Sequence, residues 1–99
     1  MYIEEIRYKT ESIFRKYSVA YAGLFGSRAR GENQNDSDTD FLIAFNKIPS
    51  LVQFIRLENE LQDILGTHVD LVVQGSEKPF IKPNIYRDLI AVYGKRPTV

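Results

Sequence analysis

The chain has 99 residues, of which 43% are hydrophobic, and its 13 basic side chains balance 13 acidic ones. This predicts a single folded domain, residues 1–99, and the lack of net charge argues against a protein that holds nucleic acid mainly by attraction to phosphates. Cysteine is absent, which excludes disulfides and thiolate metal sites, and no apolar stretch predicts a secretory signal or a membrane span, so we expect a cytoplasmic protein.

Hydrophobic periodicity divides the chain into alternating helices and strands. Apolar residues recur at helical spacing in three segments, and shorter apolar or alternating runs are typical of strands. Ser50 and Gln53 form a capping box, and Gly66 marks the end of the helix that they begin. The predicted elements are helix 2–17, strand 19–25, a short helix from Ser27, strand 38–45, helix 51–65, strand 69–73 and a last helix from Pro83 to Gly94.

The order of these elements predicts the fold class. Strands that alternate with helices indicate an α/β (α+β) domain. We expect a small mixed β-sheet with the helices packed on one face.

Two aspartates lie two residues apart on the second predicted strand. The strand period of two directs Asp38 and Asp40 to the same face, where they could share a pair of divalent cations about 3.5–4 Å apart. Asp70 lies among branched aliphatic residues on the next strand, where a carboxylate is costly to bury without a cation or hydrogen-bond donors. Oxygen ligands favour Mg²⁺ or Mn²⁺. The sequence therefore predicts a metal site formed by these three acids.

A glycine-flanked turn precedes the paired acids. Gly26 allows the backbone to approach a ligand closely, and the free N–H groups of a short helix from Ser27 would point toward a bound anion. Arg28 and Arg30 add cationic donors. A phosphate site beside a metal site is suited to a nucleoside triphosphate.

These motifs together resemble those of the minimal nucleotidyltransferase (MNT) group of the DNA-polymerase-β superfamily. The resemblance depends on residues 26–31 (GSRARG), 37–41 (SDTDF) and 69–72 (VDLV), and it extends over most of the chain. It implies a nucleotidyltransferase fold like the polymerase-β palm. One departure is visible, because Thr39 stands between the paired acids where the family usually has Ile, Leu or Val. A β-branched residue on the apolar face of the strand should be tolerated there.

The resemblance also implies roles for the residues. Asp38 and Asp40 would bind two Mg²⁺ ions, and Asp70 would bind one and help deprotonate the attacking hydroxyl. Ser27 and the neighbouring backbone would hold the phosphates of ATP. Proteins of this group typically act as antitoxins that transfer AMP to a tyrosine of a HEPN-domain toxin, and a chain of this size would need such a partner to supply the acceptor.

Several other interpretations of the same residues stay open. The chain could be an antitoxin that acts by binding alone, or an enzyme that modifies a small molecule such as an antibiotic. The pattern from Asp36 also resembles the start of a calcium loop. This interpretation is excluded, because Phe41 and Lys47 occupy positions that require Gly and Glu. A lone histidine such as His68 is more often structural or solvent-facing than a ligand.

Overall fold

The computed structural model describes residues 2–32 and 38–97. Its elements follow the order α1 (Ile3–Lys16), β1 (Val19–Phe25), β2 (Thr39–Phe45), α2 (Leu51–Leu65), β3 (Val69–Val73), α3 (Lys82–Asp88) and β4 (Ile90–Gly94). Among the described residues, no helix has both the length and the apolar character needed to cross a membrane.

The four strands form one mixed sheet in the order β3-β2-β1-β4. β1 pairs with both β2 and β4 in antiparallel orientation, whereas β2 and β3 run parallel. A parallel pair requires a crossover connection, which α2 provides between β2 and β3. The predicted α/β class with a small mixed sheet is confirmed.

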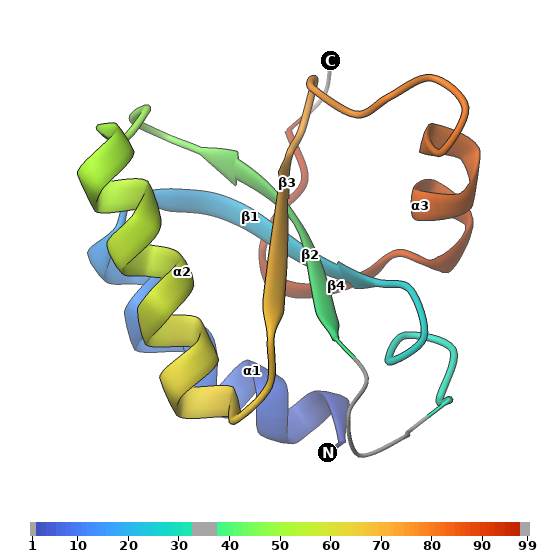
Figure 1. Cartoon of the computed structure of the whole chain (residues 1–99), viewed down its shortest axis with the longest axis horizontal. Helices are drawn as coiled ribbons and strands as arrows, with labels where there is room; N and C mark the ends of the chain where they lie inside the picture. Colours follow the sequence, from blue (N-terminus) through green and yellow to red (C-terminus); the bar gives the residue numbers. More distant parts are fainter. Residues whose placement is uncertain (1, 33–37, 98–99) are drawn as a thin grey trace.

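The helices α1 and α2 pack side by side on one face of the sheet (Figure 1). They cover the main hydrophobic core, in which the Phe14 ring contacts Phe41 edge-on, with centroids 5.6 Å apart. Thr39 faces the same core, is fully buried and shares a 2.8 Å hydrogen bond with the hydroxyl of Thr67. The Thr39 hydroxyl therefore has a hydrogen-bond partner inside the core, at a position where an aliphatic side chain would need none.

α2 begins and ends as its sequence predicts. The Ser50 hydroxyl accepts a 3.2 Å hydrogen bond from the Gln53 backbone N–H, and the Gln53 side chain accepts one from the backbone N–H of Ser50. Gly66 closes the helix in a left-handed conformation, with φ +69°. Both signals are local to the chain, which explains why sequence alone located this helix.

The last predicted helix is wrong beyond Asp88. α3 ends there, Leu89 is extended, and residues 90–94 form the edge strand β4 beside β1. Apolar residues from Ile85 to Tyr93 fit a helical spacing, but Ile90-Ala-Val-Tyr also suits a strand, and pairing satisfies backbone groups of β1 that would otherwise form an open edge. Gly94, predicted to stop a helix, lies where a Cβ would overlap the carbonyl oxygen of Ala20.

α3 lies on the opposite side of the sheet from α1 and α2, so the expected packing of the helices on one face holds for α1 and α2 but not for α3 (Figure 1). Its Ile85 is buried, as are Tyr21 and Leu42, and these three residues lie outside the main core cluster. Leu42 follows Asp40 by two residues, so both side chains leave β2 on this second face. The candidate acids therefore lie on the face of the sheet that α3 partly covers.

Candidate active site

Parallel pairing of β2 with β3 brings the predicted acids together. Asp40 and Asp70 are register partners across this pair, and Asp38 precedes Asp40 by two residues. The side chains of Asp38 and Asp70 are 50% and 52% exposed, so they can be reached from solvent. Ser37, which belongs to the same sequence motif, lies outside the described residues.

Asp40 lies deepest in this cluster. Burial, followed by the negative charges of Asp70 and Asp38 and a hydrogen bond with Asp70, raises the pKa of Asp40 to about 6, from an ordinary value of 3.8. Three carboxylates close together repel one another when all are ionised. The arrangement thus favours a bound cation, which would relieve this repulsion.

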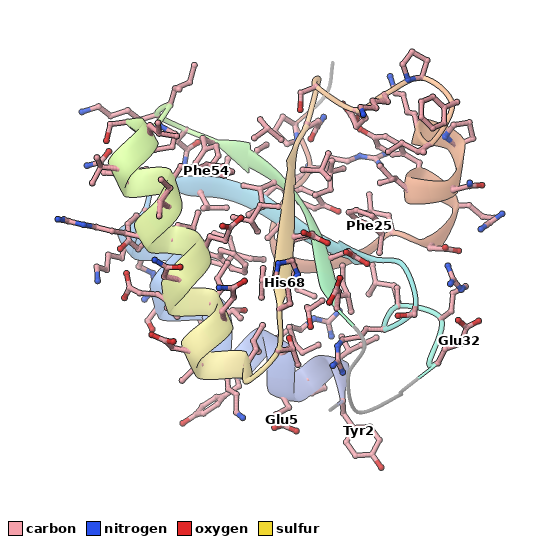
Figure 2. All side chains as sticks on the ribbon, in the orientation of Figure 1. Tyr2, Glu5, Phe25, Glu32, Phe54 and His68 are labelled. Atoms are coloured by element: carbon pink, nitrogen blue, oxygen red, sulfur yellow. The ribbon has the colours of Figure 1, made fainter. Side chains whose placement is uncertain are left out.

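His68 joins the cluster from the residue before β3 (Figure 2). Its Nδ1 lies 3.5 Å from Oδ1 of Asp38 and 3.7 Å from Oδ1 of Asp70. The possible ligand atoms of these three residues all lie within 4.8 Å of one another. The sequence interpretation of His68 as structural or solvent-facing agrees with its exposure but does not include its contact with the acids. The signal was its position two residues before Asp70, which places both side chains on one face.

The turn at Gly26 lies directly against Asp40, the most buried of the three acids. Phe25, the last residue of β1, pairs with Asp40, and Gly26 follows with φ +77°. A Cβ at Gly26 would overlap Oδ2 of Asp40 and lie 3.3 Å from its Cγ. Only glycine therefore fits between this turn and the carboxylate without displacing it.

Residues 27–31 form hydrogen-bonded turns rather than the predicted short helix. The Arg30 N–H donates to the carbonyl of Gly26 at 3.2 Å, and the Glu32 N–H donates to that of Ser27 at 2.9 Å. A segment of five residues forms too few helical hydrogen bonds to offset the cost of fixing the first helical turn. The turn still places Ser27 directly after Gly26, beside Asp40.

The two arginines of the turn differ in their surroundings. Arg28 is buried, with 7% of its surface exposed. Arg30 donates a 2.8 Å hydrogen bond to Asp88 at the end of α3 and pairs with Glu32. Arg30 thus ties the turn to α3, and the phosphate contact predicted for it would require it to exchange these partners.

The donor set fits a hard divalent cation. Carboxylate oxygens are the ligands that Mg²⁺ and Mn²⁺ prefer, and Asp38, Asp40 and Asp70 supply them from adjacent strands. An imidazole nitrogen from His68 lies within reach. The cluster can therefore hold a cation beside the turn that begins at Gly26.

A separate cavity of about 320 Å³ lies at the other end of β1 and β2. Its lining includes three cations, Lys16, Lys47 and Arg56. β1 and β2 are antiparallel, so the start of β1 and the end of β2 lie far along the sheet from the acids. This cavity is therefore distinct from the acidic cluster.

Known proteins share this fold and much of this sequence. The chain matches the family described as "Polymerase beta, Nucleotidyltransferase" over residues 8–98. It is 44% identical over 77 residues to the protein adenylyltransferase MntA of Thermococcus cleftensis, and the alignment covers 78% of each chain.

Two solved structures have the same fold at low sequence identity. One is a toxin–antitoxin with AMP-PNP, with a TM-score of 0.75 and 19% identity over 97% of this chain and 76% of that one. The other is a tri-AMPylated Shewanella oneidensis HEPN toxin in complex with an MNT antitoxin, with a TM-score of 0.71 and 18% identity over 95% of this chain and 74% of that one.

The fold and the relatives together define an enzyme of the nucleotidyltransferase class. More particularly, the chain belongs to the polymerase-β nucleotidyltransferase family, and the resemblance to its minimal members is confirmed.

Proposed function

We propose that this chain is a metal-dependent protein adenylyltransferase that transfers AMP from ATP to a tyrosine hydroxyl of a HEPN-type toxin and so acts as its antitoxin. In this proposal residues 1–99 work as a single cytoplasmic domain. The observation that carries it is the convergence of Asp38, Asp40 and Asp70 beside the turn at Gly26.

The three acids would hold two Mg²⁺ ions, for which Mn²⁺ could substitute. Such ions, when bound, would neutralise the phosphate charge and orient the triphosphate for displacement. Asp38 and Asp40 would be shared ligands because they leave β2 on one face, and Asp70 would complete the set from β3. Burial, and then the charges of Asp70 and Asp38, raise the pKa of Asp40 to about 6, and bound cations would offset both effects and favour the ionised, ligating form.

The turn would receive the triphosphate. Gly26 lies next to Asp40 and Ser27 follows it, so phosphate groups that contact this turn would also reach the cations. The Ser27 hydroxyl is a suitable donor to phosphate oxygens, and the backbone N–H groups at the start of the turn would add to it. Arg28 and Arg30 would add positive charge to this end of the site.

The transfer itself is a displacement at the α-phosphorus. The acceptor oxygen would form a bond to that phosphorus, while the bond to the oxygen that bridges the α- and β-phosphates breaks and pyrophosphate leaves. The proton of the acceptor hydroxyl would pass to Asp70, which is half-exposed and lies at the open side of the cluster.

The choice of AMP and of a protein acceptor is supported by the relatives. MntA of Thermococcus cleftensis is named a protein adenylyltransferase, and the S. oneidensis complex contains an AMPylated HEPN toxin bound to an MNT antitoxin.

The test uses this chain, Mg²⁺, ATP labelled at the α-phosphate, and a HEPN-type protein as the acceptor. We expect label on the HEPN protein, lost when its acceptor tyrosine is changed to phenylalanine. Label from the γ-phosphate instead would indicate a kinase and overturn the proposal.

The double variant Asp38→Asn, Asp40→Asn separates catalysis from binding. It should still fold and should no longer transfer label or neutralise the toxin. Neutralisation that survives in this variant would show that binding alone is sufficient, and label on an aminoglycoside without any partner would support a small-molecule enzyme.

A further inference from the structure

The contact of His68 with two carboxylates adds a nitrogen atom to a site otherwise made of oxygen. Its Nδ1 lies 3.5 Å from Asp38 and 3.7 Å from Asp70. The exposed fraction of the His68 side chain is 60%, so packing in the core does not explain its position. It is the one histidine among the 99 residues.

The spacing of these atoms suits ligands of one ion. Two ligands at about 2.1 Å from a metal lie about 3.0 Å apart when they are adjacent in an octahedron and about 4.2 Å apart when they are opposite. The two distances from His68 Nδ1 fall between these limits. Small rotations of three exposed side chains would bring all three atoms onto one cation.

We propose that His68 is a nitrogen ligand of the cation held by Asp38 and Asp70, and that it shifts the preference of the site from Mg²⁺ toward Mn²⁺. The inference rests on the proposed function, because it concerns the metal of the same site. Imidazole binds borderline transition metals well, whereas Mg²⁺ prefers oxygen and water. A site with only carboxylates would lack this bias.

Asp70 has a central position in this arrangement. It hydrogen-bonds with Asp40 on one side and lies beside His68 on the other. One cation would therefore be bound by Asp70 and His68, together with Asp38 and Asp40, which it would share with the second ion. His68 would thus bind only one of the two cations, the one on its own side of the cluster.

The single histidine makes the test direct. Pulsed EPR of bound Mn²⁺ detects ¹⁴N coupling from a directly ligated imidazole, and in an untagged chain only His68 can supply one. We expect ¹⁴N coupling in the wild-type protein and none in His68→Gln. The variant should lose roughly tenfold in Mn²⁺ affinity but much less in Mg²⁺ affinity, measured by competition with Mn²⁺.

The outcomes separate this inference from the proposed function. Mn²⁺ that binds without ¹⁴N coupling, or equal losses for both metals in His68→Gln, would overturn the ligand role and leave the carboxylate site intact. A wild-type chain that binds no Mn²⁺ even with ATP would overturn both. Circular dichroism and thermal unfolding of His68→Gln verify that it is folded.

Discussion

Replacing Gly26 by alanine should weaken the binding of metal and nucleotide at the candidate site as well as the fold. Gly26 has φ +77°, and a Cβ there would overlap Oδ2 of Asp40. The added methyl group forces the carboxylate to rotate or move away from the turn. Because Asp40 is a proposed metal ligand, its displacement should weaken the binding of metal and nucleotide together.

Gly31 provides a matched control, because it has the same φ of +77° and a Cβ there would meet nothing within 4 Å. Gly31→Ala should therefore add only the strain of a left-handed backbone, about 1–2 kcal/mol of unfolding free energy. Gly26→Ala adds an overlap with Oδ2 of Asp40, which lies at the end of a side chain that can rotate away. We therefore expect a similar loss of unfolding free energy in the two variants, and a displaced Asp40 carboxylate only in Gly26→Ala.

Urea unfolding measures the two stabilities, and calorimetry measures the binding of ATP with Mn²⁺ under conditions where both variants are folded. Gly31→Ala should bind with nearly the wild-type affinity. Gly26→Ala should lose at least roughly tenfold, or about 1.4 kcal/mol. Equal losses of binding affinity in the two variants would refute the reasoning, since backbone strain alone would then explain them.

Three further changes test other parts of the structure. Asp40→Asn should stabilise the metal-free protein at pH 7.5, because the raised pKa of Asp40 means that folding disfavours its ionised form. The gain in thermal unfolding temperature should shrink as pH falls through about 6 and vanish near the ordinary pKa of 3.8. A gain that is independent of pH would contradict this reasoning. Phe14→Ala, in the fully buried core, should lower the unfolding free energy by about 3–5 kcal/mol in urea titrations, and a loss below about 1 kcal/mol would refute its packing role. Arg30→Met should raise the pKa of Asp88 in an NMR titration, although Arg87, the larger cause of its lowered pKa, remains; an unchanged value would show that the ion pair does not form in solution.

Elements such as α2, whose ends are marked by residues near them in sequence, could be predicted. The strand β4, which forms because it pairs with β1, could not. The capping box at Ser50 and the glycine at position 66 fixed the limits of α2. Residues 90–94 carry an apolar pattern that both a helix and a strand can use, and pairing with β1 decides between them. Such long-range pairing leaves no local mark in the chain.

The candidate site shows the same division. Alternation along β2 was enough to place Asp38 and Asp40 on one face, and the parallel pairing with β3 then brought Asp70 opposite Asp40. The contact of His68 with the acids and the ion pair of Arg30 with α3 depend on distances between elements, which the sequence does not contain.

The most direct test of the central claim is a crystal structure with Mn²⁺ and a nonhydrolysable ATP analogue, analysed by anomalous scattering. We predict two manganese peaks bound by Asp38, Asp40 and Asp70, with the triphosphate against the turn at Gly26 and Ser27. A nucleotide bound elsewhere, with no manganese among these three carboxylates, would contradict the account.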